Sequence, residues 1–537
     1  MGMTSALLST REALRPHREE TPAEYASRLA SRFAAHISLQ SRRELAQFFT
    51  PLDVARFMAS LARPDRPVQR IIDPGAGTGV LACAVCEVIP SRTGRVHLDA
   101  YEVDPALASM CHMTLAYAKA WLAARGTIFD FTIHQADYVT QNPIVRGLFD
   151  TTTPIRYDIA VANPPYFKLH KFDPRAVAAS AVIHGQPNIY AIFMAVTASL
   201  LSEGGVMVTI TPRSFATGDY FRRFRQHLFA AVVPEAVHLF HSRKEAFRSD
   251  AVLQENVILR ARKAQPSPSA TVAVSASAGA ADLDHRRIRN VPLASVVDLG
   301  SRNVIFNIPA DESDDEVIRF VRSWPTSLHH LGLEVSTGPV VAFRARKFLV
   351  HEPAEDKDLA PLLWLQNIRR MTVQWPSDRS AKAQYIRDSL DSRGLLVRNA
   401  TYVLLRRFTA KEERRRLTAA PLFCGQLPGR AIGLENHLNY IHRPHGEIGR
   451  DEAIGLAALL GSALLDRYFR VSSGTTQVNA VEVRALPLPS RGSIMTLGNE
   501  IGRQSLGPRD TEEAVAEILR VPRAFLKGTE VEAIGEG

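Results

Sequence analysis

The sequence predicts an α/β fold in its first half and a mixed α+β domain in its second half. From residue 70 onward, short apolar runs alternate with helical patterns, and the first run leads into a glycine-rich loop that opens a helix. Beyond about residue 290 this alternation gives way to short strand-like runs with scattered basic residues. We therefore expect a Rossmann-like sheet with helices on both faces, followed by a second domain.

The expected elements of the first half follow one another as such a sheet requires. A helical pattern over residues 52–61 precedes a strand at 70–72, and an apolar helix at 80–89 follows the glycine loop. Further strands are expected at 96–101, 131–134, 157–162, 206–210 and 252–259, with a helix from 188 to about 201. The turn-rich stretch 263–269 predicts a boundary between domains 1–265 and 266–537, and a strand at 272–275 would begin the second domain.

A glycine loop, Asp73-Pro74-Gly75-Ala76-Gly77-Thr78-Gly79, joins the first predicted strand to its helix. Its glycines allow positive φ and let the backbone approach a ligand closely. Acidic residues end the next two strands: Glu102 is followed by Val103, and Asp137 by Tyr138. An acid at the first place suits ribose hydroxyls and one at the second suits an adenine amine, so this edge of the sheet is predicted to bind an adenosine-containing cofactor.

The tetrapeptide Asn163-Pro164-Pro165-Tyr166 follows the strand at 157–162. An exocyclic amine or amide nitrogen is a poor nucleophile because its lone pair is delocalised. The Asn163 side-chain oxygen and the Pro164 carbonyl can accept its two N–H groups, since prolines fix φ and remove competing donors. Tyr166 offers an aromatic face for a planar base. The pattern indicates methyl transfer to nitrogen, and a proline-rich turn after a buried strand is the alternative without chemistry.

With these motifs in this order, the chain resembles the gamma-class N6-adenine DNA methyltransferases, which use S-adenosylmethionine and occur in bacterial restriction-modification systems. The resemblance covers roughly the first half and includes the segment Gln47-Phe48-Phe49-Thr50-Pro51 ahead of the glycine loop. The family's catalytic tetrapeptide, (Asp/Asn/Ser)-Pro-Pro-(Tyr/Phe/Trp), matches residues 163–166 without a mismatch.

The resemblance implies roles for individual residues. It places Thr50 at the methionine part of the cofactor and residues 73–79 at its amino-acid end. It places Glu102 and Val103 at the ribose and ring, and Asp137 and Tyr138 at the adenine. The implied cofactor-binding residues are Thr50, Asp73, Gly75, Ala76, Gly77, Glu102, Val103, Asp137, Tyr138 and Asn163. Tyr166 and Phe247 would stack on the two sides of the target adenine, with Phe240 close enough to be an alternative to Phe247.

The implied reaction is methyl transfer from S-adenosylmethionine to N6 of an adenine flipped out of double-stranded DNA. Enzymes that methylate an RNA base or a protein glutamine share the Asn-Pro-Pro-Tyr loop, but the segment 47–51 and the large C-terminal half argue against them. A DNA-binding subunit without turnover is a non-enzymatic alternative, against which the intact Asn163 and glycine loop argue. The segment ahead of Gln47 is too short for a nuclease, so any cleavage would belong to a separate restriction endonuclease.

Composition agrees with a nucleic-acid partner. The 537 residues include 65 Lys and Arg against 55 Asp and Glu, a net charge of +10. Four cysteines exclude a disulfide framework and favour the reducing bacterial cytoplasm. Cys83 and Cys86 fall on a predicted helix and are expected to be core residues, so we expect no metal. No signal peptide and no membrane span are expected.

The second half is predicted to select the DNA target. Cationic clusters at 344–347, 369–370, 406–407 and 414–416 suit phosphate contacts, although each alone is more often a solvated face. Arg213 and the basic helix around 222–225 could also face DNA, and a solvated helix face is an equally good interpretation. Near the end, an apolar helix at 454–465, the run 473–479 and Leu486-Pro487-Leu488-Pro489 resemble the end of a target recognition domain in restriction-type adenine methyltransferases.

Overall fold

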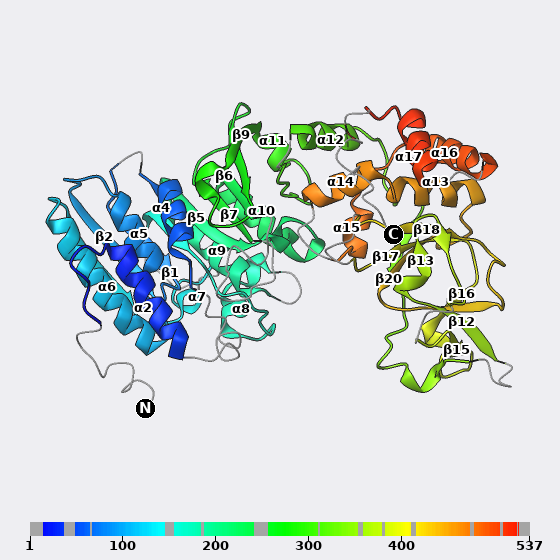
Figure 1. Cartoon of the computed structure of the whole chain (residues 1–537), viewed down its shortest axis with the longest axis horizontal. Coiled ribbons are helices and arrows are strands. Elements are labelled where there is room, and N and C mark those ends of the chain that lie inside the picture. The colour runs from blue at the N-terminus through cyan, green and yellow to red at the C-terminus, as the bar shows by residue number, and fades with distance from the viewer. Residues whose placement is uncertain are drawn as a thin grey trace, which may run out of the picture. The chain divides into compact units, whose positions relative to one another are not determined.

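The computed structural model describes residues 14–36, 49–64, 67–144, 155–183, 187–240, 256–309, 312–352, 358–377, 382–409, 415–472, 477–504, 508–522 and 525. The chain forms two compact units that divide between Ala310 and Asp311 (Figure 1). Among the described residues, no helix combines the length and apolar character that crossing a bilayer requires.

The first unit is built on a nine-stranded sheet in the order β3-β2-β1-β4-β5-β7-β6-β8-β9. Its strands are β1 (Arg70–Pro74), β2 (Arg95–Tyr101), β3 (Ile128–His134), β4 (Tyr157–Ala162), β5 (Leu201–Pro212), β6 (Val233–Phe240), β7 (Asn256–Arg262), β8 (Thr271–Ser277) and β9 (Arg287–Pro292). Strands β3, β2, β1, β4 and β5 are parallel, and β7 is antiparallel to both β5 and β6. The strand order reverses between β1 and β4, which is where open α/β sheets bind their ligands.

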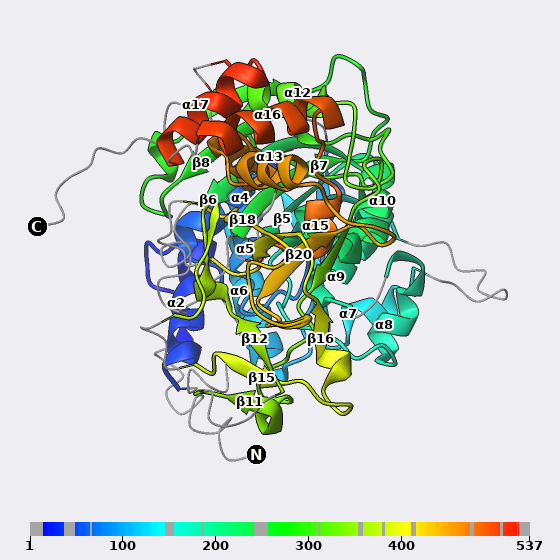
Figure 2. The same ribbon diagram turned by 90° about the vertical axis from the view of Figure 1, so that its right-hand side faces the viewer.

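Helices cover both faces of this sheet, as Figures 1 and 2 show for α2 and α10. The helices are α2 (Pro22–His36), α4 (Leu52–Ala62), α5 (Val80–Val88), α6 (Pro105–Ala123), α7 (Tyr138–Gln141), α8 (Pro174–Ala178), α9 (Ile189–Leu200), α10 (Arg222–Ala231) and α11 (Leu293–Val296). Neighbouring residues of a strand point to opposite faces. Ile71 accordingly joins the core under α2, α4, α5 and α6, whereas Ile72 joins the core under α9 and α10. The predicted Rossmann-like fold is confirmed.

The predicted boundary at 265/266 is wrong, because the sheet continues past it. Strand β8 contains the predicted strand 272–275, but it pairs in parallel with β6 and in antiparallel fashion with β9, so it extends the first sheet. The first unit consequently reaches Ala310. The turn-rich stretch after Arg262 is the connection between β7 and β8, not a linker between domains.

Two element predictions also need correction. Strand β5 begins directly at Leu201, because the pair Gly204-Gly205 exchanges backbone hydrogen bonds with Lys263 and so extends the strand instead of forming a loop. The predicted helix 454–465 is two helices, interrupted at Gly461-Ser462. The second helix starts at Ala463, whose backbone N–H donates to the Glu512 carboxylate. The first N–H groups of a helix lack partners within it, so this contact supplies one.

The second unit is a mixed α+β domain, as predicted. Its sheets have the orders β10-β20-β17-β18, β11-β15-β12-β19-β16 and β13-β14. The strands are β10 (Glu334–Thr337), β11 (Leu349–Val350), β12 (Leu359–Leu363), β13 (Ile368–Arg369), β14 (Thr372–Val373), β15 (Tyr385–Arg387), β16 (Leu396–Arg398), β17 (Tyr402–Arg406), β18 (Ala419–Leu422), β19 (Ala431–Leu434) and β20 (Leu438–His442). The helices are α12 (Glu312–Arg322), α13 (Arg450–Leu460), α14 (Ala463–Ser472), α15 (Ala480–Arg484), α16 (Arg491–Gln504) and α17 (Pro508–Ile518).

Candidate functional site

The glycine loop between β1 and α5 has the backbone conformation that its sequence predicts. Gly75, Gly77 and Gly79 have φ of +77°, +57° and +83°, a region that residues with a side chain rarely adopt. At Gly79 space is also short, because a Cβ would lie 2.9 Å from Thr114 Oγ1 and 3.2 Å from Cys111 Sγ. The turn therefore brings main-chain groups, not side chains, to the end of the sheet.

Glu102, at the end of β2, ties this loop to the neighbouring strand. One carboxylate oxygen accepts the Gly77 N–H at 2.9 Å, and the other accepts the Asp104 N–H at 2.8 Å. Burial raises the pKa of Glu102, while the two backbone hydrogen bonds act in the opposite direction by favouring the charged form. The loop and the acid thus hold each other in position before any ligand arrives.

Asp73 carries a second buried carboxyl group at the base of the loop. One oxygen accepts the Ala82 N–H at 3.1 Å, and Oδ1 has no hydrogen-bond partner among the described residues. Burial raises the pKa of Asp73 to about 7, with a further contribution from Glu102. A buried oxygen with an unused lone pair is suited to a cationic ligand group.

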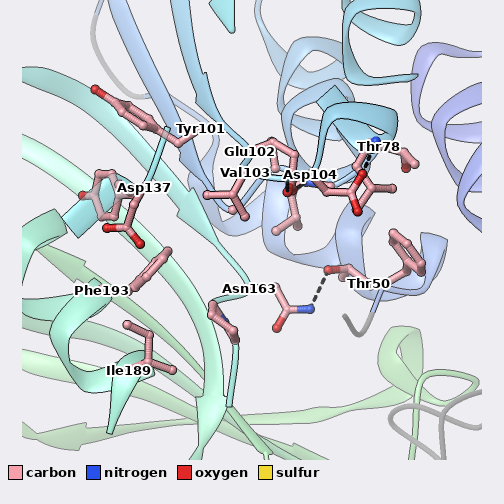
Figure 3. Close-up of a pocket in the computed structure, with 18 of the residues that line it drawn as sticks. Thr50, Thr78, Tyr101, Glu102, Val103, Asp104, Asp137, Asn163, Ile189 and Phe193 are labelled. Atoms are coloured by element: carbon pink, nitrogen blue, oxygen red, sulfur yellow. Dashed lines mark hydrogen bonds between the residues drawn. The ribbon is translucent and has the colours of Figure 1, made fainter. Parts of the chain in front are cut away.

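Asn163 follows β4 directly and is held by two hydroxyl groups. Its Nδ2 donates to Thr50 Oγ1 at 3.1 Å (Figure 3). Its Oδ1 accepts the Tyr166 hydroxyl at 2.7 Å. The Tyr166 oxygen also lies 3.1 Å from the Ile210 carbonyl, and burial raises its pKa, so the hydroxyl keeps its proton and donates. Together, these two hydrogen bonds fix the orientation of the Asn163 side-chain amide.

The glycine loop and the Asn-Pro-Pro-Tyr segment line one cavity of about 490 Å³. In Figure 3, Tyr101 and Asp137 lie on one side of Asn163, and Thr50 and Thr78 lie on the other. The lining residues are Phe49, Thr50, Gly75, Ala76, Gly77, Thr78, Val80, Leu81, Tyr101, Glu102, Val103, Asp104, Leu107, Ala136, Asp137, Tyr138, Asn163, Pro165, Phe167, Arg175, Ile189 and Phe193. Two motifs separated by more than 80 residues of sequence therefore share a single binding space.

Most, though not all, of the residues predicted for the site line this cavity. Asp73, Pro164 and Tyr166 do not; Asp73 lies beneath the loop, and the ring of Tyr166 packs on the hydrophobic core. Tyr138 is buried, and its hydroxyl is hydrogen-bonded to Thr197. Phe247 lies outside the described residues, as do Gln47 and Phe48, and Phe240 is a fully buried core residue.

Four of the lining residues outside the predicted set show how the walls of the cavity are built. A Cβ on Gly77 would lie 3.5 Å from the Phe49 ring, and one on Gly75 would lie 3.7 Å from the Phe193 ring, so these aromatic rings flank the loop. Phe167 and Arg175 contact each other at the wall, with the guanidinium 5.5 Å from the ring centre. Phe49 stands in the recognised segment, whereas no local pattern marks Phe193 or Arg175.

The cavity fits S-adenosylmethionine by the chemistry of its lining. Glu102, Asp104 and Asp137 line the cavity, and Arg175 is the single cation among its described lining residues. This balance of charge suits a positively charged molecule. Val103 is 62% exposed and offers an apolar surface to a flat ring. The close approach allowed by the glycines completes the fit.

Strand order, glycine loop and cavity define a Rossmann-like methyltransferase. In agreement, residues 126–247 match the family model described as Eco57I restriction-modification methylase. The chain is 32% identical to the type II methyltransferase M.BsuBI of Bacillus subtilis, over 91% of this chain and 97% of that protein. It is 31% identical to M.PstI of Providencia stuartii, over 89% and 94% of the two chains. The chain belongs to the family of type II restriction-modification methyltransferases, which confirms the family that the sequence motifs indicated.

A solved structure has a similar fold across both units. The type IIL restriction-modification enzyme MmeI, solved in complex with DNA, matches with a TM-score of 0.51 and 10% identity, over 98% of this chain and 81% of that chain. At this identity the likeness concerns the fold alone. A methyltransferase of this family uses a methyl donor of the S-adenosylmethionine type, in line with the fit of the cavity.

Proposed function

We propose that this enzyme transfers a methyl group from S-adenosylmethionine to N6 of an adenine in double-stranded DNA, as part of a restriction-modification system. The observation that carries the proposal is the shared cavity: the glycine loop and Asn163 line one space. A direct transfer needs donor and acceptor side by side, and positioning of this kind supplies a large part of an enzyme's rate enhancement.

The chain's own residues would hold the cofactor as follows. Gly75 to Gly77 and Asp73 hold the amino-acid end, Glu102 the ribose, and Asp137 the adenine amine, with Val103 against the ring. Asp137 has a competing task, since it also accepts the Thr140 N–H at 2.9 Å as the cap of α7. When bound, the cofactor supplies an electrophilic methyl group.

Asn163 would bind the target amine through Oδ1, with the Pro164 carbonyl as second acceptor. Accepting both N–H groups localises the nitrogen lone pair and stabilises the positive charge that develops on nitrogen. Because the Tyr166 hydroxyl already donates to Oδ1, the amine either displaces it or shares the oxygen's second lone pair. Displacement would release Tyr166 from Asn163 and let its ring stack on the base.

Base flipping is needed because the cavity cannot reach the amine of an adenine inside the duplex. The amine of a paired adenine is engaged inside the duplex, so the base must leave the stack, at a cost of a few kcal/mol. Stacking against an aromatic face offsets about 1–3 kcal/mol of this cost. Tyr166 is our proposed partner on one side, and Phe247 remains the proposed partner on the other.

The second unit is the proposed target recognition domain, and the structure sorts its cations. Arg344, Arg346 and Lys347 are exposed and suit phosphate contacts. Arg370 and Arg415, by contrast, both bind Glu512, so they stabilise the unit internally. In the first unit, Arg213 and Arg225 are buried, and Arg225 donates to backbone carbonyls including Phe215 and Val304, which corrects the expectation that they face DNA.

The proposed partner is a separate restriction endonuclease that recognises the same DNA sequence. We also propose that catalysis needs no metal. The paired spacing of Cys83 and Cys86 has a structural explanation, because both side chains are fully buried in the core around α5. We propose a bacterial cytoplasmic location for the enzyme.

The proposal is tested by identifying the product. Purified enzyme is incubated with duplex DNA and isotopically labelled S-adenosylmethionine, and the nucleosides are analysed by mass spectrometry. We expect labelled N6-methyladenine, absent with Asn163→Ala. Labelled N4-methylcytosine or 5-methylcytosine would contradict the proposal. Label in structured RNA or in a glutamine-containing protein, with none in DNA, would favour the alternative substrates.

A further inference from the structure

A short loop directly after the catalytic segment exposes a large aromatic side chain. Phe172 is 70% exposed. Among the described phenylalanines, only Phe343 is more exposed. It lies at the tip of a turn in which the Asp173 N–H donates to the His170 carbonyl at 3.0 Å. A single exposed apolar side chain is common on protein surfaces, so the function of Phe172 has to be inferred from its surroundings.

Both ends of this loop are fastened at the wall of the cavity. Phe167 precedes the tip and Arg175 follows it; both line the cavity, and they contact each other. The Leu169 N–H donates to the Pro187 carbonyl at 2.7 Å, and the Ile189 N–H donates to the Phe167 carbonyl at 3.0 Å. The tip is therefore a supported projection next to the catalytic segment.

The exposed surface around Phe172 is basic. Lys168, His170 and Lys171 are exposed, and the Lys171 ammonium lies 4.8 Å from the centre of the Phe172 ring. The nearest acid in sequence, Asp173, is paired with Arg175 at 2.7 Å. Helix α8, which follows the tip, lies beside α7 in both views of the molecule (Figures 1 and 2). An exposed aromatic ring can stack on a nucleic-acid base, and exposed cations beside it can contact the flanking phosphates.

We propose that residues 168–172 form a wedge for the DNA duplex, with Phe172 entering the stack beside the flipped base and Lys168 and Lys171 contacting the flanking phosphates. This inference rests on the proposed function. Apolar side chains inserted between base steps are a general means of unstacking a duplex. The wedge would act on base flipping alone, since Phe172 does not line the cavity.

The test separates flipping from chemistry. Single-turnover methylation is measured on two duplexes that carry the recognition sequence found by mapping the methylated sites: one fully paired, the other with an abasic site opposite the target adenine. We expect Phe172→Ala to slow methylation of the paired duplex about tenfold, as loss of one stacking contact would. On the abasic duplex, where flipping costs less, we expect the rate of the unmodified enzyme.

The control is Ile288→Ala, which removes another exposed apolar side chain from the first unit and should leave both rates unchanged. Equal slowing of both duplexes by Phe172→Ala, or no slowing at all, overturns the wedge. A weaker affinity for S-adenosylmethionine, measured by calorimetry without DNA, would show that the loop covers the cofactor instead. Failure of the unmodified enzyme to methylate either duplex overturns the proposed function as well.

Discussion

The two walls of the cavity are held in place by different means. On the cofactor side, main-chain groups fix the wall: the glycine loop turns through positive φ, and Glu102 accepts hydrogen bonds from backbone N–H groups. On the target side, the amide of Asn163 is oriented by the side chains of Thr50 and Tyr166. The cofactor wall is therefore a local structure, whereas the target wall depends on a contact between residues 113 positions apart.

The largest effect is expected on the cofactor wall. Gly79→Ala places a methyl group 2.9 Å from Thr114 Oγ1, which cannot retreat freely because it donates to the Thr78 carbonyl. Together with the positive φ, this should cost about 2–4 kcal/mol of stability. Thermal unfolding measures the loss. Gly94→Ala, in open space, is the matched control. Equal melting temperatures for the two variants would show that the loop tolerates a side chain.

An intermediate effect is expected on the target wall. Thr50→Val removes the hydroxyl that accepts a hydrogen bond from Asn163 Nδ2, and one such bond contributes about 0.5–1.5 kcal/mol. The single-turnover rate should fall about tenfold, because the amide is then held less firmly with its oxygen toward the target amine. Thr50→Ser retains the hydroxyl and should recover most of the rate. If serine fails where valine fails, shape and not the hydrogen bond matters at this position.

A third effect, which is seen only when stability is compared between pH values, concerns Asp73. The unfolded chain releases this proton near the usual pKa of 3.8, whereas the folded protein retains it until about pH 7. The folded state therefore binds more protons between these values, so stability falls as pH rises through this window. In Asp73→Asn that contribution is absent, and its melting temperature relative to the unmodified protein should rise from about pH 5 to about pH 7.5. Parallel curves would contradict the buried, protonated carboxyl group.

The sequence allowed the sheet and the cofactor wall to be predicted because their signals are local. Glycines at 75, 77 and 79 indicate positive φ directly. Acids at the ends of strands mark the edge of the sheet where a ligand binds. The roles of Phe193 and Arg175 could not be predicted, since they reach the cavity only through the packing of α9 and α8. The boundary prediction failed for the same reason: pairing of β8 with β6 joins segments separated by about 30 residues, and no local pattern reports it.

The hydrogen bond from Tyr166 to Asn163 was also invisible to sequence reasoning. The motif predicted a stacking ring, and the structure adds a hydroxyl that occupies the proposed amine acceptor. Only two residues of sequence stand between Asn163 and Tyr166, but the directions of their side chains depend on strand β4 and on the Ile210 carbonyl of β5. Motif and tertiary contact together define the target wall.

The most direct test of the account is the single-turnover methylation rate of Asn163→Ala beside that of Asn163→Asp. Alanine removes the acceptor oxygen and should lower the rate about 100- to 1,000-fold, the usual cost of losing one group that stabilises transition-state charge. Cofactor and DNA affinities should change little. Aspartate keeps an acceptor oxygen and should retain more activity than alanine. Methylation by Asn163→Ala at the rate of the unmodified enzyme would contradict the assignment of Asn163 as the acceptor of the target amine.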